Sequence, residues 1–339
     1  MTSPQSVSYP QLRTNQFLES FAGARVLVTG GAGFVGSRIA RGLVERGAAV
    51  TVLDDLSTGR RELLPDGLEE FVEGSVTDAS TVRRCVEGRA FVFHLAVRNI
   101  ILSTRELLDD YTVNIGGTLN VLMACRDSQA LRRLVYTSSV SIYGNPRSLP
   151  ICEEEGINIL SPYAASKLAG ESYCSAFFEM YQLPVTVIRY SNVFGAHQSP
   201  HNPYCGVVSK FFAACMQGRP MSIHGSGLQT RDLTYVDDAV EATLLSAVTP
   251  RAEGEVFNIG SGREITIREL AEAVAGTVGV DCSIEFVDRR DIDNVQRRVL
   301  NIEKARRVLR WIPKLDLDRG LRMTHEWLRE QDAVVVAPR

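Results

Sequence analysis

The sequence predicts an α/β protein with a Rossmann-type, doubly wound parallel sheet and a smaller C-terminal α/β lobe. Short apolar runs of strand length alternate with stretches of helical spacing as far as Ser191. A glycine-rich turn joins the first of these strands to the first helix, and beyond Ser191 prolines and glycines interrupt the pattern. Because parallel strands need crossover connections, this alternation indicates helices on both faces of one sheet.

The expected elements follow one another along the chain. Strands are expected at residues 25–29, 49–53, 90–95, 134–137 and 185–190, and helices at 37–46, 114–126 and 164–181. Later strands at 221–224 and 283–287 alternate with helices at 266–278 and 303–310. Segments 236–247 and 255–259 are expected to return to the main sheet.

These patterns divide the chain into three parts. Residues 1–20 form an N-terminal extension, and 21–191 form a Rossmann domain to which 236–261 return. Residues 192–235 and 262–330 form the second lobe. No repeat or low-complexity linker separates the parts, so we expect two lobes with a cleft between them.

The composition excludes several classes of protein. Against 37 Lys and Arg stand 40 Asp and Glu, and a net charge of −3 does not fit a nucleic-acid-binding surface. No apolar run reaches the length of a membrane span, and residues 1–20 lack the apolar core of a secretory signal. The seven scattered cysteines, without a C-x-x-C pair, suit a reducing, cytoplasmic location. His197 and His201 are four residues apart but have no evident third ligand, so no metal is expected.

Residues 30–36 (GGAGFVG) fit the dinucleotide-binding pattern G-x-G-x-x-G between a strand and a helix. Glycines there permit a tight turn and let the backbone approach a pyrophosphate, while the helix N-terminus offers free N–H groups. Asp54 follows the second strand, where it would accept hydrogen bonds from the adenosine ribose and repel a 2′-phosphate. We therefore expect NAD rather than NADP, although Arg60 and Arg61 lie close enough to tolerate a phosphate.

Tyr163 and Lys167 form a Tyr-x-x-x-Lys pair within a predicted helix. Residues four apart share a helical face, so the ammonium would lie beside the phenol and lower the pKa of Tyr163. Ser139 lies 24 residues upstream, directly after a predicted strand, where its hydroxyl would reach the ligand-binding edge of the sheet.

Together these motifs resemble the extended short-chain dehydrogenases/reductases, and among them the NAD-dependent epimerase/dehydratase family that includes UDP-glucose 4-epimerases. The resemblance runs from Val26 to about Trp327. Its landmarks are residues 30–36, Asp54, His94-Leu95-Ala96, Asn114, Ser139, Tyr143-Gly144, Tyr163, Lys167, Arg189, Asn192 and Arg231-Asp232.

The resemblance implies roles for these residues. Tyr163 would be the base, Lys167 its activator and ribose anchor, Ser139 the partner of the reacting oxygen, and Asn114 a structural residue that helps to hold the lysine. Cofactor contacts are implied at Gly30, Gly33, Phe34, Val35, Gly36, Asp54, Ser75, Val76, Leu95, Ala96, Lys167 and Tyr190. Substrate contacts are implied at Ser139, Tyr163, Asn192, Val207, Arg231, Arg297 and Arg298, with Asn192, Arg231 and Arg297 facing a diphosphate. Helices 114–126 and 164–181 would form a homodimer interface.

The chain departs from the family pattern at three places. Ser75 stands where the family usually has an aspartate that meets the adenine. Arg98 introduces a cation near the cofactor pyrophosphate or the substrate, and we count it among the substrate contacts. Residues 289–293 (RRDID) replace the usual Arg-Pro-Gly-Asp segment, and Arg298 falls near a position that sets how large a sugar substituent fits.

The function implied by the resemblance is that of an NAD-dependent nucleotide-sugar 4-epimerase of the UDP-glucose/UDP-galactose type, acting on a UDP- or dTDP-sugar. Ser139-Val140-Ser141 lacks the Asp and Glu with which the dehydratases expel water. The alternatives are an epimerase for a UDP-uronic acid or a UDP-N-acetylhexosamine, with Arg98 or Arg298 meeting a carboxylate, or a 4-ketoreductase, dehydratase or decarboxylase. A further alternative is a non-catalytic dinucleotide sensor. The presence of Ser139, Tyr163 and Lys167 argues against it, because a protein that only binds the dinucleotide would need none of them.

Overall fold

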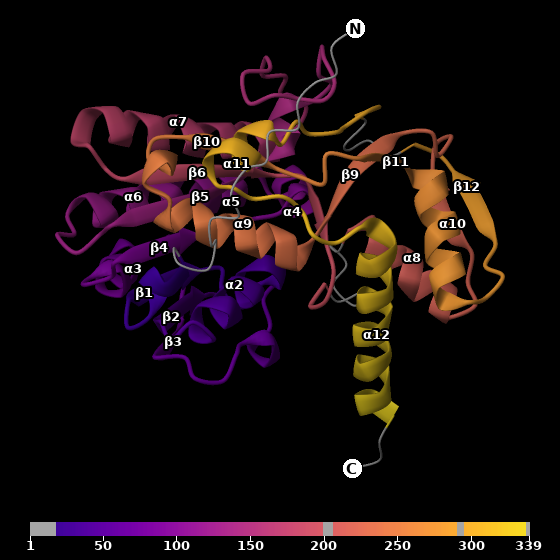
Figure 1. Cartoon of the computed structure of the whole chain (residues 1–339), viewed down its shortest axis with the longest axis horizontal. Coiled ribbons are helices and arrows are strands. Elements are labelled where there is room, and N and C mark those ends of the chain that lie inside the picture. Colours follow the sequence, from indigo (N-terminus) through magenta and orange to yellow (C-terminus); the bar gives the residue numbers. More distant parts are fainter. Residues whose placement is uncertain (1–17, 199–205, 290–294, 337–339) are drawn as a thin grey trace, which may run out of the picture.

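Seven parallel strands form the central sheet of the protein (Figure 1). The computed structural model describes residues 18–198, 206–289 and 295–336, so most of the predicted N-terminal extension lies outside the described residues. The strands are β1 (Arg25–Thr29), β2 (Ala49–Asp54), β3 (Glu70–Glu73), β4 (Phe91–His94), β5 (Arg133–Ser139), β6 (Val185–Tyr190) and β10 (Val256–Ile259). All pairings between these strands are parallel, so the predicted Rossmann-type sheet is confirmed.

The strand order of the sheet is β10-β6-β5-β4-β1-β2-β3. The chain runs outward from β1 through β2 to β3, then crosses back to β4 and continues through β5 and β6 in the other direction. In open sheets of this kind, ligands bind outside the carboxyl ends of the strands at the point where the order reverses. The topology therefore places the site beyond the ends of β1 and β4.

Helices cover both faces of the sheet because successive strand residues point to opposite sides. Val26 and Val28 of β1 pack with Ile39 in one apolar cluster, whereas Leu27 packs with Val82 in the other. The helices of the first face are α2 (Phe34–Val44) and α9 (Val236–Val248), and those of the second are α3 (Ala79–Val86), α6 (Thr118–Arg126) and α7 (Pro162–Tyr181).

The smaller lobe lies beside the central sheet, at the right of Figure 1. One sheet of this lobe has the order β11-β9-β7, and a second pairs β8 with β12 in parallel. The elements of the lobe are β7 (Asn192–Phe194), α8 (Val207–Met216), β8 (Met221–His224), β9 (Thr230–Tyr235), β11 (Glu264–Thr266), α10 (Ile267–Val278), β12 (Ile284–Val287) and α12 (Leu317–Val336). Between them, α9 and β10 return to the central sheet, where β10 pairs with β6.

Short helical segments complete the described chain. They are Glu19–Phe21, Arg61–Leu63, α4 (Ile100–Arg105), α5 (Leu107–Asp110), Tyr111–Gly117, Val140–Tyr143, Pro250–Ala252 and α11 (Glu303–Val308).

The sequence-based prediction did not include β3, α3, β7, α8, β11 and α12. Three further differences have a clear physical reason. Helix α2 begins at Phe34 rather than at residue 37, because Gly33 already serves as its N-cap. The helix expected over 114–126 begins with a π-helical turn, Tyr111–Gly117, before α6. Strand β9 (TRDLTY) was not predicted, because its polar residues are buried by neighbouring segments that the local pattern does not reveal.

A buried ion pair joins α7 to the sheet. The Arg189 guanidinium on β6 donates to both carboxylate oxygens of Glu171 on α7 at 2.6–3.1 Å, and the two side chains are only 8% and 7% exposed. Arg189 also donates to the Tyr143 hydroxyl at 2.7 Å, and that hydroxyl donates to Asn258 Oδ1 at 2.8 Å. The network links α7, β6, the segment after β5, and β10.

Replacing Glu171 by Leu should lower the free energy of unfolding by about 3–5 kcal/mol, because it leaves the buried Arg189 without its counter-charge. Urea denaturation measures the change. The double variant with Arg189→Met should recover part of the loss, since no buried charge then remains. Glu272→Leu, which removes the exposed Arg268–Glu272 pair, is the control and should cost about 1 kcal/mol or less. Equal losses in the two single variants would contradict the role given to the buried pair.

Candidate active site

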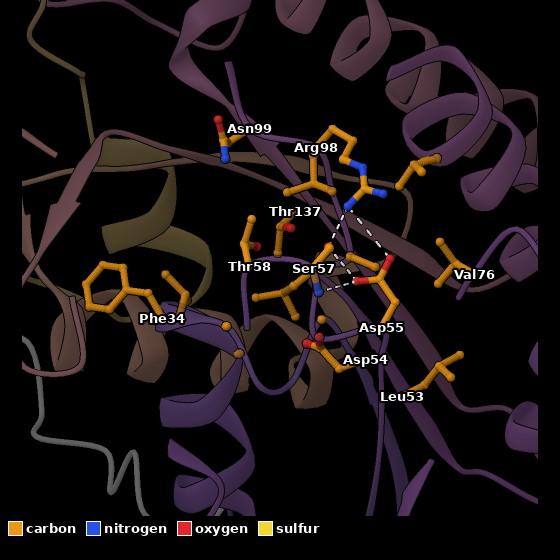
Figure 2. Close-up of a pocket in the computed structure, with 18 of the residues that line it drawn as sticks. Phe34, Leu53, Asp54, Asp55, Ser57, Thr58, Val76, Arg98, Asn99 and Thr137 are labelled. Carbon is orange, nitrogen blue, oxygen red and sulfur yellow. Dashed lines mark hydrogen bonds and ion pairs between the residues drawn. The ribbon is translucent and has the colours of Figure 1, made fainter. Parts of the chain in front are cut away.

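A cavity of about 360 Å³ opens beyond the carboxyl ends of the central strands (Figure 2). The sequence-predicted residues that line it are Gly30, Gly33, Phe34, Val35, Gly36, Asp54, Ser75, Val76, Leu95, Ala96, Arg98, Tyr163, Lys167 and Tyr190. The lining residues that the sequence analysis did not assign are Leu53, Asp55, Ser57, Thr58, Gly74, Val97, Asn99, Val113, Thr137, Ser138 and Gln198. Most of the second group lie in the last residues of a central strand or in the loop that follows it, which is the signal that would have identified them.

The glycine-rich turn is built for close contact between backbone segments. A Cβ atom on Gly36 would lie 2.1 Å from the carbonyl oxygen of Gly30, and one on Gly30, whose φ is +68°, would lie 2.7 Å from the Ala96 nitrogen. The N-cap Gly33 has no side chain to occupy the first N–H groups of α2, so these remain available to an anion. The turn therefore fits the pyrophosphate of a dinucleotide.

Asp54 fixes this turn from the end of β2. Its Oδ2 accepts from the Ala32 backbone N–H at 2.9 Å, and its Oδ1 accepts from the Leu56 N–H at 2.9 Å. Burial raises the pKa of Asp54, and these two hydrogen bonds act in the opposite direction. Arg61 lies over the Phe71 ring and pairs with Glu73, and it is not among the residues that line the cavity.

Tyr163 and Ser139 meet at the carboxyl end of β5. The Ser139 hydroxyl acts to lower the pKa of Tyr163, but burial has the larger effect and raises this pKa to about 12. The sequence analysis expected Lys167 to lower this pKa. That expectation was wrong for the geometry described here, because the phenol loses hydration on burial and the lysine points elsewhere.

The Lys167 ammonium donates to the Thr137 carbonyl oxygen at 2.7 Å and lies 5.0 Å from the centre of the Tyr136 ring. Burial lowers the pKa of Lys167 to about 8, while the carboxylates of Glu171 and Asp110 act to raise it. Near neutral pH the lysine is therefore still largely a cation, one helical turn from Tyr163.

Asn114 supports the lysine only indirectly. Its Oδ1 accepts from the Arg98 backbone N–H at 2.7 Å, and its Nδ2 donates to Asp110 at 2.6 Å and to the Ser166 hydroxyl at 3.1 Å. Ser166 precedes Lys167 on α7. The asparagine thus connects the segment after β4 to the helix that carries Tyr163 and Lys167.

The other predicted substrate residues do not line the cavity. Arg231 is buried and donates to the Val295 carbonyl oxygen at 3.0 Å, whereas the exposed Arg297 pairs with Glu264 at 2.6 Å. Arg298 is buried, and the Asn192 amide oxygen is buried without a hydrogen-bond partner among the described residues. Val207 begins α8.

Two sequence-based expectations concern metals and membranes. Within the described residues, no three His, Cys, Asp or Glu side chains are grouped so that they could bind a metal ion. His197 Nδ1 contacts Ser37 Oγ at 3.0 Å, while His201 lies outside the described residues. No helix in the described part of the chain is long and apolar enough to cross a membrane.

Comparisons with known proteins all identify the same protein family. The model of the NAD dependent epimerase/dehydratase family matches residues 26–260. The chain is 39% identical over 317 residues to the UDP-glucose 4-epimerase of Mycolicibacterium smegmatis, covering 91% of this chain and 99% of that protein. It is also 31% identical to a UDP-N-acetyl-alpha-D-glucosaminuronate decarboxylase of Bacillus cytotoxicus (90% and 98% covered) and 32% identical to the dTDP-D-glucose 4,6-dehydratase of Bos taurus (92% and 90%).

Solved structures of the family are similar over almost the whole chain. An epimerase from Methanothermobacter thermautotrophicus has a TM-score of 0.92 at 33% identity, with 96% of this chain and 98% of that chain covered. The UDP-glucose 4-epimerase of Thermotoga maritima, solved with UDP-glucose, has a TM-score of 0.87 at 35% identity, with 91% and 99% covered. The enzyme of Thermus thermophilus, solved with NAD, has a TM-score of 0.83 at 35% identity, with 90% and 99% covered. NAD is accordingly the cofactor of this chain.

The lowered pKa of Lys167 predicts a specific dependence of stability on pH. Between about pH 8 and pH 10.5, Lys167 has lost its proton in the folded protein but still holds it in the unfolded chain. The free energy of unfolding therefore rises with pH in this range. Relative to Lys167→Met, the wild type should therefore gain about 2 kcal/mol between pH 7 and pH 10. Urea denaturation at several pH values measures the difference. The control is Lys314→Met, which removes an exposed lysine, and the same pH dependence in both variants would refute the assignment.

Proposed function

Because the chain belongs to the NAD-dependent epimerase/dehydratase family, we propose that it is a nucleotide-sugar 4-epimerase of the UDP-glucose/UDP-galactose type. The observation that carries the proposal is the placement of Tyr163 beside Ser139 at the carboxyl end of β5, with Tyr163 and Lys167 lining the dinucleotide cavity one helical turn apart. A relative at 39% identity and a solved structure at 35% identity both bear the name UDP-glucose 4-epimerase, which supports the same assignment.

In the proposed reaction, Tyr163 takes the proton of the sugar C4 hydroxyl, and Ser139 hydrogen-bonds the same oxygen. Lys167, one helical turn from Tyr163, is proposed to anchor the ribose of the cofactor, and its positive charge is lost as the pH rises through about 8. When bound, NAD supplies the hydride acceptor for oxidation at C4 and the hydride for the reverse step. The sugar is released with C4 inverted after the 4-ketose turns, and Tyr163 returns the proton.

The cavity favours an epimerase over a dehydratase or decarboxylase. The carboxylates among its lining residues, within the part of the chain that the structure describes, are Asp54 and Asp55, at the end of β2. Three strand spacings, about 14 Å, separate β2 from β5, which carries Ser139. The positions after Ser139 are the buried Val140 and Ser141, and neither is a strong acid or base. Elimination of water from the sugar would need such a pair near Tyr163.

The substrate lobe is part of the same proposal. We assign the diphosphate to Asn192, Arg231 and Arg297 and the nucleotide to the region of Val207. Binding energy from the diphosphate would then anchor the substrate while the sugar alone moves. Arg298 is proposed to limit the substituents that the sugar site accepts.

A C4-deuterated UDP-glucose tests the reaction. The expected product is UDP-galactose that keeps deuterium at C4 and an unchanged C6, because the hydride returns to the carbon that it left. NMR follows both positions, and UDP-glucuronate and UDP-N-acetylglucosamine in parallel reactions test the range of sugars. A 4-keto-6-deoxy product, loss of carbon dioxide, or loss of the C4 label would reject the proposed epimerisation.

Tyr163→Phe is the control for the role of the base. The variant keeps the ring and loses the hydroxyl, so turnover should fall by a factor on the order of 10²–10⁴. Retention of bound NAD shows that the site is still formed. Near-native turnover would mean that another group acts as the base.

We also propose a homodimer formed by α5, α6 and α7. Large apolar side chains stand exposed on these helices and the π-helical turn between them, namely Leu107, Leu108, Tyr111, Met123, Tyr173, Met180 and Tyr181. A concentration of exposed apolar side chains on successive helices favours a protein–protein interface.

Light scattering during gel filtration should therefore give twice the chain mass. The pair of substitutions Leu108→Glu and Met180→Glu, at side chains 82% and 75% exposed, should give a monomer. Leu228→Glu, at a side chain 68% exposed in the smaller lobe, is the matched control and should leave the dimer intact. A wild type of single-chain mass would exclude the interface.

A further inference from the structure

The Arg98 side chain bridges two segments at the rim of the cofactor cavity (Figure 2). Its Nε donates to Asp109 Oδ2 on α5 at 2.5 Å. On the other side, Nη1 donates to the Ser57 hydroxyl and lies 3.7 Å from Asp55 Oδ2. Asp55 and Ser57 belong to the segment after β2, so one guanidinium joins that segment to α5.

The two segments joined by Arg98 flank the adenosine end of the cavity. Asp54, the last residue of β2, and Val76, after β3, lie on the same side of the cavity as Asp55 in Figure 2. Arg98 is directed toward these residues, and its side chain is only 17% exposed. The guanidinium thus lies toward the part of the cavity where Asp54 would bind the ribose of a dinucleotide.

The positive charge of Arg98 also affects the electrostatics of the cavity. The cations among the residues that line the cavity, in the described ranges, are Arg98 and Lys167. Lys167 is held at the other end by its hydrogen bond to the Thr137 carbonyl oxygen. Arg98 thus offsets one of the two negative charges of Asp55 and Asp109 at this end of the cavity.

The backbone of Arg98 is held rigidly, which lowers the entropy cost of positioning the guanidinium. Its N–H donates to Asn114 Oδ1 at 2.7 Å, and its carbonyl oxygen accepts from Asn114 Nδ2 and from the Ser103 hydroxyl, both at 3.1 Å. The same Asn114 amide donates to Ser166 on α7. The bridge is therefore anchored to the catalytic helix.

We propose that Arg98 is a latch that retains NAD: the dinucleotide leaves only when the bonds of Arg98 to Asp109 and to the Asp55–Ser57 segment break. The latch slows dissociation of NAD because it ties two segments together across the adenosine end of the cavity. This effect is separate from any direct attraction between the Arg98 charge and the pyrophosphate. This inference depends on NAD as the cofactor and not on the proposed epimerisation, so the two can fail separately.

The test measures cofactor release without any sugar. Protein loaded with NADH is mixed with excess NAD in a stopped-flow instrument, and the loss of NADH fluorescence gives the dissociation rate constant. Arg98→Gln should raise this constant about tenfold or more, since it removes charge-assisted hydrogen bonds. Arg105→Gln removes an exposed arginine of the adjacent α4 and should leave the constant unchanged. Arg98→Lys keeps the positive charge but loses the planar guanidinium, which can donate to two partners at once. This variant should therefore also release NADH faster than the wild type.

Asp109→Asn separates a latch from simple charge attraction. If Arg98 acted only by attracting the pyrophosphate, removing a nearby carboxylate would strengthen binding and slow release. A latch loses one of its two anchors, so release should become several times faster. Circular dichroism and thermal unfolding establish that each variant is folded. Unchanged release in Arg98→Gln, or unchanged or slower release in Asp109→Asn, would overturn the proposal.

Discussion

The positions of Tyr163 and Lys167 depend on how α7 is anchored to the sheet. Apolar packing alone is non-directional and would allow the helix to slide or rotate by small amounts. The Glu171–Arg189 ion pair removes this freedom, because a guanidinium that contacts both carboxylate oxygens fixes direction as well as distance. One turn earlier, Lys167 donates to the Thr137 carbonyl oxygen at the end of β5. Tyr163 is thereby held beside Ser139.

A chain of polar contacts continues from α7 to the opposite end of the cofactor cavity. Ser166 bonds to Asn114, and Asn114 holds the backbone of Arg98, whose guanidinium reaches Asp109. The glycine-rich turn forms the remaining wall, where close backbone approaches leave no space for a Cβ atom. The site is therefore assembled by buried hydrogen bonds between segments distant in sequence, and each unmade bond there would be costly.

Much of the fold could be predicted from the sequence, and the site only in part. Most strands of the central sheet are recognisable because they are buried on both faces and form continuous apolar runs, but the edge strand β3 (EFVE), whose first and last residues are exposed, was not predicted. Strand β9 is not recognisable either, because its Thr, Arg and Asp side chains are satisfied by distant partners, such as Ser261 for Asp232. Likewise, Gly36 and Tyr163 stand in recognisable motifs. Asp109 stands in none, and its importance follows only from its contact with Arg98.

The sequence by itself determined the alternation of strands and helices, the dinucleotide turn, and the placement of Tyr163 and Lys167 on one face of a helix. These features depend on local periodicity and backbone sterics, which a short window of residues contains. Only the tertiary structure decided that the pKa of Tyr163 rises, that Lys167 points to Thr137, and that Arg98 faces Asp55 and Asp109. Burial and charge pairing set these properties, and both depend on residues that the fold brings together from far apart in the chain.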